Sequence, residues 1–153
     1  MEKDPFKILI ELFDSKKIEY ELHEHEPAIT VKEALKVRHT DALGLKSLLF
    51  KADNENVLLI LPGERKVSSK KVRSFIGVKD VRMVSPEEVF SIMGCEIGGC
   101  YPVGSVCGLR TIMDRSIEGA DRIVFNAGRR DRSVEMRWMD LKKLFPFEIG
   151  ELS

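Results

Sequence analysis

Residues 93–105 read MGCEIGGCYPVGS and differ in composition from the rest of the chain. It holds four of the eleven glycines, two of the three cysteines and one of the six prolines. Its single charged residue is Glu96, in a chain of which 33% is charged. Glycines let a backbone approach a ligand closely, and proline fixes the direction in which the chain leaves. The stretch is either a tight turn or a wall of a binding site, and composition alone favours the turn.

The length and composition are those of one ordinary globular domain. The chain has 153 residues, of which 43% are hydrophobic, and this is enough for a single core. Lys plus Arg and Asp plus Glu number 25 each, so net charge gives no general attraction to nucleic acid or to an anionic membrane. No apolar run approaches the roughly 18 residues that span a bilayer, so we expect no membrane partner. We divide the domain into an N-terminal helix and linker (1–20), a core (21–145) and an irregular tail (146–153).

The cysteines and the N-terminal residues help to predict the cellular compartment of the protein. Cys95, Cys100 and Cys107 are odd in number and form no CxxC pair, which is typical of reduced thiols. The first twelve residues, MEKDPFKILIEL, have the pattern of a helix rather than of a signal peptide. We therefore expect a cytoplasmic protein.

Apolar periodicity and capping residues predict a mixed α+β domain of about seven strands and five helices. Helices are expected where apolar residues recur at helical spacing next to a capping residue: 5–17 after Asp4, 30–38 after Thr30, 68–76 before Gly77, 86–93 after Ser85, and 141–145 after Asp140. Strands are expected in short apolar runs between turn signals: 18–23, 47–52, 57–61, 81–84, 110–113, 122–126 and 133–138. The runs 47–52 and 57–61 should form an antiparallel hairpin at the centre of the sheet.

Three common kinds of site have weak support. His23 and His25 could share a strand face and be joined by His39, but their separations match no common zinc spacing, so we expect no metal. A cysteine nucleophile with a histidine partner is a second option, but nothing indicates a lowered thiol pKa, and small buried cysteines are common. The sequence GCEIGG follows a helix rather than a strand and matches neither the Walker pattern nor the dinucleotide fingerprint.

Lys46 is a more specific candidate. It follows the turn-like Leu43-Gly44-Leu45 and enters the apolar run SLLFKA, whereas Lys51 should project to the opposite face. A lysine here is usually a solvated strand end, but at the mouth of a cleft its ammonium can bind a phosphate or a carbonyl oxygen. Other polar residues stand at predicted strand ends, where turn and cap roles are commoner than site roles: Asp114, Ser116, Asp121 and Asn126.

Two groups of basic residues could together bind an RNA backbone. They are the run Arg129, Arg130 and Arg132, and the group Lys66, Lys70, Lys71 and Arg73. Such a patch would neutralise phosphates. Charge runs are more often solvated loops, so charge alone favours a solvated surface.

Several short motifs follow one another in a distinctive order. They are HEP at 25–27 leading to TVKEA at 30–34, Lys46 before its apolar strand, VSPEEV at 84–89, Gly94 and IGGCYPVG at 97–104, TIMD at 111–114, the NAG turn at 126–128, and Asp140-Leu141. In this order and spacing, from about His23 to Leu144, the chain resembles the YbaK/ProX family of aminoacyl-tRNA deacylases. These are relatives of the editing domain of bacterial prolyl-tRNA synthetases.

The resemblance implies a hydrolase that cleaves the ester between a mischarged amino acid and tRNA. It implies a mixed, barrel-like sheet of about six to seven strands surrounded by helices, and no metal or organic cofactor. In the family a lysine at the position of Lys46 matters most for activity, and the G-x-x-x-P loop forms part of the aminoacyl pocket. We therefore expect Lys46 to be catalytic and these residues to bind substrate: Gly98, Gly99, Cys100, Tyr101, Pro102, Asp114, Asn126 and Gly128. The expected partners are aminoacyl-tRNA and prolyl-tRNA synthetase.

A site that hydrolyses an aminoacyl ester needs few catalytic groups from the protein. An aminoacyl ester is already activated, so the protein must hold it, admit a nucleophile and stabilise the developing oxyanion. The nucleophile is water, a ribose hydroxyl of the tRNA or the thiol of a misloaded cysteine. Amides from Gly98 to Cys100 are candidate donors. Lys46 would hold the terminal adenosine phosphate or the reacting carbonyl oxygen.

Departures from the family pattern leave the amino acid open. Members that clear alanine tend to have Asn where this chain has Ser47, and a histidine where it has Arg129-Arg130. The Gly-x-Arg sequence is closer to the cysteinyl-tRNA(Pro) deacylases, but these tend to have a small hydroxyl residue at the position of Asn126. Two other readings stay open: a non-catalytic module that binds aminoacyl-tRNA or a synthetase, which neutral charge suits, and a structural domain whose loop is only a turn.

Overall fold

Eight strands form one mixed sheet in this computed structural model, which describes residues 4–27 and 41–153. Neighbouring strands follow the order β1-β7-β6-β2-β3-β5-β8, and β4 pairs with β2. The strands are β1 (Tyr20–Glu24), β2 (Leu43–Ala52), β3 (Glu55–Pro62), β4 (Val81–Met83), β5 (Arg110–Asp114), β6 (Arg122–Arg129), β7 (Arg132–Arg137) and β8 (Glu148–Gly150). The α-helices of the described residues are α1 (Pro5–Ser15), α3 (Ser69–Ile76), α4 (Pro86–Met93) and α5 (Trp138–Leu141). The helix predicted at 30–38 lies outside the described residues.

Capping side chains set the ends of the two helices that border the loop and the basic segment. Ser85 Oγ accepts a hydrogen bond from the backbone N–H of Glu88 at 3.2 Å, and α4 ends at Gly94. Ser68 caps α3 in the same way, and that helix ends at Gly77. These ends confirm the boundaries that serine caps and terminal glycines predict. No described helix has the length and apolar character needed to cross a membrane.

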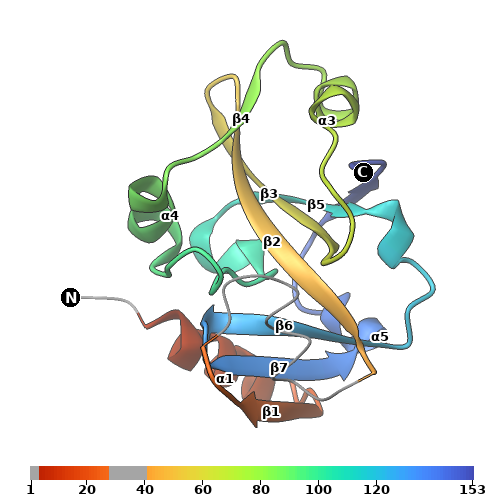
Figure 1. The fold of residues 1–153 in the computed structure, drawn as a ribbon. Helices are drawn as coiled ribbons and strands as arrows, with labels where there is room; N and C mark the ends of the chain where they lie inside the picture. Colours follow the sequence, from red (N-terminus) through yellow and green to blue (C-terminus); the bar gives the residue numbers. More distant parts are fainter. Residues whose placement is uncertain (1–3, 28–40) are drawn as a thin grey trace.

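β2 joins the two parts of the sheet. Its first two residues pair in parallel with β6, Leu43 with Ile123 and Gly44 with Val124. From Leu45 onward it pairs antiparallel with β3, which confirms the predicted hairpin. In Figure 1, β1, β7 and β6 form one layer, and β2 and β3 run away from it toward α3 and β4. The pairing of β2 with β6 therefore ends at Gly44, and the two strands separate after this residue.

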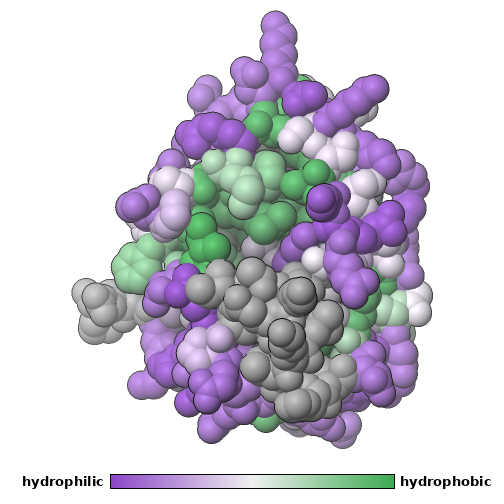
Figure 2. Space-filling view, in the orientation of Figure 1, coloured by the Kyte–Doolittle hydropathy of each residue, from purple (hydrophilic) through white to green (hydrophobic). Residues whose placement is uncertain are grey.

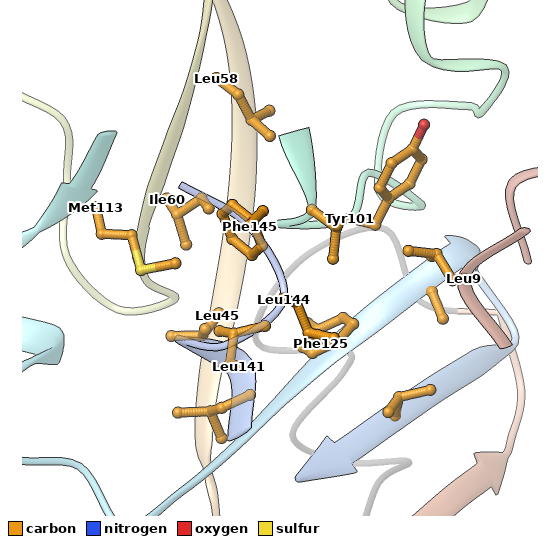
Figure 3. Packing of buried hydrophobic residues seen from close by; sticks show 14 of the residues in the cluster. Leu9, Leu45, Leu58, Ile60, Tyr101, Met113, Phe125, Leu141, Leu144 and Phe145 are labelled. Carbon is orange, nitrogen blue, oxygen red and sulfur yellow. The ribbon is translucent and has the colours of Figure 1, made fainter. Parts of the chain in front are cut away.

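β3 is buried on both faces, which explains its unbroken apolar run. Leu58 and Ile60 face the larger of two hydrophobic clusters, which also takes in α1, β6 and the loop. Leu59 faces the smaller cluster, with Val72 of α3 and Leu152 near the C-terminus. Figure 3 shows side chains of the larger cluster converging from these elements: Leu9, Leu45, Leu58, Ile60, Tyr101, Met113, Phe125, Leu141, Leu144 and Phe145.

The C-terminal segment is not the irregular tail that the sequence predicts. β8 pairs in parallel with β5, with Met113 opposite Ile149, and Leu152 is fully buried. β8 raises the strand count to eight. A strand of three residues is too short to show a periodic pattern, so only its tertiary pairing reveals it.

Two predicted boundaries are also wrong. Asp140 does not cap the last helix but lies within α5, which begins at Trp138 and buries Trp138 and Leu141, three residues apart. The segment 43–45 is not a turn but the start of β2, since its parallel pairing with β6 extends the strand. Lys46 accordingly lies inside a strand rather than at its first residue.

Gly104, at the end of the loop, lies where no side chain fits. A Cβ on this residue would overlap Thr111 Oγ1 and lie 3.0 Å from the carbonyl oxygen of Leu109. We expect Gly104→Ala to lower the free energy of unfolding by about 2 kcal/mol, because overpacking a buried site typically costs 1–3 kcal/mol. Urea unfolding measures this loss. Adding Thr111→Ala should restore part of it, and fully additive losses from the two changes would contradict the explanation.

Candidate functional site

Lys46 and Asn126 lie on the same face of the sheet, opposite the larger core. β2 and β6 are paired in parallel at Gly44 and Val124, and Lys46 and Asn126 are each two residues further along. Because side chains alternate along a strand, both project to the face that Gly44 and Val124 share. The intervening residues of both strands belong to the larger hydrophobic cluster. Lys46 and Asn126 thus lie on either side of the point where the two strands separate.

Asn126 connects this face to the glycine-rich loop. Its Nδ2 donates to the carbonyl oxygen of Gly98, and its Oδ1 accepts a hydrogen bond from Ser133 Oγ at 2.9 Å. Ser133 lies opposite Asn126 on β7, and its Oγ is 2.6 Å from Nε2 of His25. Asn126 is 8% exposed and Ser133 is fully buried, so these hydrogen bonds are shielded from water. A buried strand side chain therefore holds the loop in place.

Arg130 and a backbone turn hold the first half of the loop. Arg130 Nε donates to the carbonyl oxygen of Ile97 at 2.7 Å, and the guanidinium pairs with Glu96 at 2.9 Å. The N–H of Gly99 donates to the carbonyl oxygen of Glu96 at 2.9 Å and so is taken up by the turn. The N–H of Gly98 has no hydrogen-bond partner among the residues that the structure describes. Of the predicted donor amides, that of Gly99 is therefore occupied, whereas those of Gly98 and Cys100 form no hydrogen bond with another described residue.

The ammonium of Lys46 is partly buried in a basic environment. Its Nζ donates to the carbonyl oxygen of Arg65, in the turn after β3. Burial, and after it the charge of Lys66, lower the pKa of Lys46 below its usual value. Within the described residues, no hydrogen bond or ion pair joins Lys46 to the Gly98–Pro102 loop. Since burial and a neighbouring cation both disfavour a lone ammonium, a phosphate or oxyanion beside Lys46 would be stabilised.

Apolar residues lie on the same face of β2 as Lys46. Leu48, the next residue on the same face of β2, is only partly buried and packs against the smaller cluster. On the face seen in Figure 1, an apolar patch lies over the upper part of β2 and is framed by polar surface (Figure 2). A small apolar group and a polar ester could both be accommodated on such a surface.

Asp114 is engaged by the C-terminal segment. Its Oδ1 accepts hydrogen bonds from the N–H groups of Leu152 at 2.8 Å and Ser153 at 3.1 Å, and its Oδ2 accepts from the hydroxyls of Ser116 and Ser153. Burial alone would raise the pKa of Asp114, but these hydrogen bonds outweigh burial and hold the pKa below its usual value. The carboxylate therefore has a structural role. No hydrogen bond to the loop, within the described chain, supports its predicted contact with substrate.

Tyr101 and Pro102 are buried parts of the loop rather than exposed contacts. The Tyr101 hydroxyl donates to the carbonyl oxygen of Met93 at 2.9 Å and lies 2.9 Å from Cys107 Sγ. Burial, and after it the contact with Cys107, raise the pKa of Tyr101. Cys100 is half-buried. Tyr101 thus anchors the loop to the end of α4.

Two hollows adjoin the loop on either side of Gly128. The smaller, of about 340 Å³, is lined in part by Gly99, Gly128 and Arg130, and the larger, of about 640 Å³, by Tyr101 and Gly128 among others. Gly128 has φ +84°, and an added Cβ would lie 2.9 Å from Pro5 Cβ, so only glycine fits there without strain. Lys46 lines neither hollow. Of the predicted binding residues, the structure brings Gly98, Gly99, Asn126 and Gly128 together.

One group of side chains in the described residues has the donor atoms to hold a metal ion. These atoms belong to Glu21, His23 and Glu135 and lie within 4.8 Å of one another. Arg122 Nε is 2.7 Å from Glu135 Oε2, so a guanidinium already supplies positive charge to this carboxylate. We assign the group no metal function.

The two basic groups differ in their pairing. Arg129, Arg130 and Arg132 pair with Asp4 at 3.4 Å, Glu96 at 2.9 Å and Glu24 at 3.6 Å. In contrast, Lys66, Lys70 and Arg73 form no ion pair with a described residue. The second group therefore has the charge to offer an RNA backbone.

The sequence did not predict that Ser133 and Arg130 support the loop; Arg130 was expected only in a basic run that could bind RNA. Ser133 and Asn126 are polar residues within otherwise apolar strand runs, and they face each other across β6 and β7. A polar residue inside a buried strand is a usable signal, since burial requires a hydrogen-bond partner. Arg130 gives no such signal, because an arginine in a turn is usually solvated. The turn itself lies at 130–131 rather than at the predicted 126–128, since β6 continues to Arg129.

Comparison with known proteins places the chain in a family. A model of the aminoacyl-tRNA editing domain matches residues 25–144. The proline–tRNA ligase of Thermosipho melanesiensis is 29% identical over 160 residues, which cover 96% of this chain and 28% of the ligase. The uncharacterised protein YwhH of Bacillus subtilis is 34% identical over 109 residues, which cover 71% of this chain and 64% of that protein. The chain thus spans less than two thirds of either relative.

Solved structures show the same fold. A candidate trans-editing enzyme for prolyl tRNA synthetase has a TM-score of 0.82 at 21% identity, covering 99% of this chain and 98% of that one. The protein APE2540 has a TM-score of 0.82 at 19% identity, covering 94% and 97%. The mixed α+β architecture is therefore that of editing domains. Because the family model matches most of the chain, this protein belongs to the aminoacyl-tRNA editing domain family.

Proposed function

We propose that this protein is a trans-editing hydrolase that cleaves the ester of mischarged aminoacyl-tRNA, with tRNA(Pro) carrying cysteine, alanine or another small amino acid as substrate. Family membership supports the reaction class, and similarity to part of proline–tRNA ligases supports tRNA(Pro). The observation that carries the proposal is that Lys46 and Asn126 share one face where β2 and β6 separate, with Asn126 bonded to Gly98. Lys46 is thus on β2, and the loop is held by a side chain of β6 on the same face of the sheet.

The proposed reaction needs stabilisation of negative charge on the ester carbonyl oxygen. Lys46 would bind that oxygen or the terminal phosphate, and the available N–H of Gly98 would be a second donor. A water, a ribose hydroxyl or a substrate thiol attacks the carbonyl carbon. The bond from that carbon to the ribose oxygen then breaks, and the tRNA leaves with a free hydroxyl. Asn126 acts through Gly98 as a positioning residue.

The direct test is release of amino acid from mischarged tRNA(Pro), compared with spontaneous hydrolysis in the same buffer. We expect the protein to accelerate release of a small, wrong amino acid. Tight binding of the charged tRNA without any acceleration would instead indicate a non-catalytic binding module. That module would also be expected to bind a synthetase, since the neutral net charge of the chain provides little affinity for RNA by itself.

Loss of the Asn126 amide should slow deacylation. Asn126→Ala frees the carbonyl of Gly98, and because misplacement of a site group by about 1 Å can cost 10²-fold, we expect a loss of about 10- to 100-fold. The control is Ser116→Ala, which removes a hydroxyl from Asp114 and leaves the loop contacts intact. Equal rates for wild type and Asn126→Ala, with folding preserved, would contradict the positioning role.

The unpaired cations before and on α3 should contribute to tRNA affinity. The double variant Lys66→Ala/Lys70→Ala removes two of them, and the slope of log affinity against log salt should become shallower by about 1.5, since each phosphate contact contributes roughly 0.7–0.9. The matched control is Lys7→Ala/Lys16→Ala, of which Lys7 is on α1 and Lys16 follows its last residue; α1 lies at the opposite end of the molecule from α3 in Figure 1. The same change in slope for both double variants would show that only net charge matters.

A further inference from the structure

Two thiols lie against each other within the glycine-rich loop. Cys95 Sγ donates a hydrogen bond to Cys100 Sγ at 3.6 Å, and both residues are free thiols. The third cysteine, Cys107, forms no hydrogen bond with either of these thiols in the described residues, and its Sγ is 2.9 Å from the Tyr101 hydroxyl. Cys95 belongs to the larger hydrophobic cluster and Cys100 packs against it, but the proposed deacylation gives the contact between the two thiols no role.

We propose that Cys95 and Cys100 are a covalent modification site: a dithiol that a small-molecule disulfide oxidises to an intramolecular disulfide. Cys100 lies in the loop predicted to bind substrate, but the oxidation does not use Lys46, Asn126 or the N–H of Gly98. Formation of the disulfide can therefore be measured separately from deacylation. Its basis is the distance between the sulfurs, the turn that joins them and the different surroundings of the two thiols.

The turn between the cysteines permits the bond. A disulfide has an S–S length of about 2.05 Å, so the sulfurs must approach by about 1.5 Å. The four intervening residues form a turn closed by the hydrogen bond from Gly99 N–H to Glu96 O, which already brings the ends together. Gly98 has φ +94°. Adjacent glycines let this short segment adjust its backbone at little steric cost.

The two thiols have different roles. The hydrogen bond from Cys95 lowers the pKa of Cys100 against the opposing effect of burial, and Cys100 is only half-buried. The same contact, followed by burial, raises the pKa of Cys95, which is 2% exposed. A thiolate is the nucleophile in thiol–disulfide exchange. Cys100 is therefore the attacking residue, and Cys95 resolves the intermediate.

The exchange is balanced in two steps with oxidised glutathione as the probe. The Cys100 thiolate attacks one glutathione sulfur, forms a mixed disulfide and releases one glutathione thiolate, which takes up a proton. The Cys95 thiol then loses its proton and attacks Cys100 Sγ, so that the second glutathione leaves. Two protein thiols are oxidised and one glutathione disulfide is reduced to two thiols.

The disulfide would constrain the glycine-rich loop at the candidate site. Gly98, whose carbonyl accepts the hydrogen bond from Asn126, lies between the two cysteines. Closing the disulfide fixes the ends of the segment that carries this carbonyl. The modification site is thus placed where it can alter the loop without touching Lys46.

The test is incubation of the native, full-length protein in glutathione redox buffers, followed by thiol titration and mass spectrometry. Wild type should fall from three titratable thiols to one and lose about 2 Da, with the peptides of Cys95 and Cys100 joined. Cys107→Ser, the matched control, should fall from two thiols to none. Cys100→Ser should retain both thiols.

Three results would overturn the proposal. One is a wild-type protein that keeps three thiols under oxidising buffer; another is a bridge that includes Cys107. The third is a stable glutathione adduct on Cys100, which would show that Cys95 does not resolve it. If the protein forms the disulfide but has no deacylase activity, the modification site is supported and the proposed function is not. If it is an active deacylase but does not form the disulfide, only the modification site is refuted.

Discussion

Lys46→Ala should reduce deacylation of mischarged tRNA(Pro) by about 10²–10³-fold, the loss typical of removing one preorganised donor to an oxyanion. The ammonium is partly buried, faces the same side of the sheet as Asn126 and has one carbonyl oxygen as its partner among the described residues. Burial and Lys66 lower its pKa, so an anionic ligand would gain more from it than from a fully solvated lysine. Single-turnover release of the labelled amino acid measures the loss.

The matched control is Lys51→Ala. Lys51 is on the same strand and also partly exposed, but it is five residues further along and projects to the opposite face. We expect its deacylation rate to stay within about twofold of wild type, since it lies on the other face. Equal rates for wild type and Lys46→Ala, or equal losses for the two lysine variants, would contradict the catalytic role. Urea unfolding of both variants separates loss of activity from loss of folding.

Asp114→Asn should lower the free energy of unfolding by about 3 kcal/mol. Hydrogen bonds to charged groups contribute about 1.5–3 kcal/mol each, and the substitution removes the charge that strengthens those from the N–H groups of Leu152 and Ser153. The asparagine amide oxygen can still accept these two, but an NH2 donor replaces the second oxygen, so the N–H of Ser116 loses its acceptor. Part of the loss should appear as detachment of the C-terminal segment, which hydrogen exchange of β8 would detect. The control is Glu151→Gln, an exposed acid in the same segment that pairs with Arg115 at 3.5 Å and should cost under about 0.5 kcal/mol.

The contribution of Asp114 to the free energy of unfolding should decrease as the pH falls. Because the folded-state pKa is held below its usual value, ionised Asp114 stabilises the fold at pH values above its unfolded pKa of about 4. This stability is lost as the pH falls through the folded-state pKa, where the native carboxylate takes up a proton. The difference between wild type and Asp114→Asn should therefore be full at pH 7 and shrink below about pH 4. A difference that grows in acid would contradict this explanation.

Local signals in the sequence predicted most of the fold. Ser85 and Gly94 bracket α4 because a hydroxyl cap and a left-handed glycine act within a few residues of themselves. The hairpin of β2 and β3 follows from two apolar runs on either side of a short turn. These features need no knowledge of tertiary structure. The residues themselves drew attention to Lys46 and the glycine-rich loop, and the family resemblance then gave them roles in a site, because their local patterns are equally those of a strand end and a turn.

Tertiary contacts account for what the sequence did not predict. The hydrogen bond from Asn126 to Gly98 joins residues 28 positions apart, and β8 has only three residues with which to signal a strand. Asp114 looked like a strand-end site residue, but its partners are backbone groups close to the C-terminus. The contact of Cys95 with Cys100 depends on the shape of the turn between them. Spacing along the chain does not encode any of these pairings.

The most direct measurement of the proposed function is single-turnover deacylation of one tRNA(Pro) charged in turn with cysteine, alanine and proline. Each rate is compared with spontaneous hydrolysis and with that of Lys46→Ala. We predict that wild type releases cysteine or alanine at least about 100-fold faster than buffer and much faster than proline, and that Lys46→Ala abolishes most of this difference. Release of no amino acid above the spontaneous rate, with the protein folded and bound to the tRNA, would contradict the proposed function.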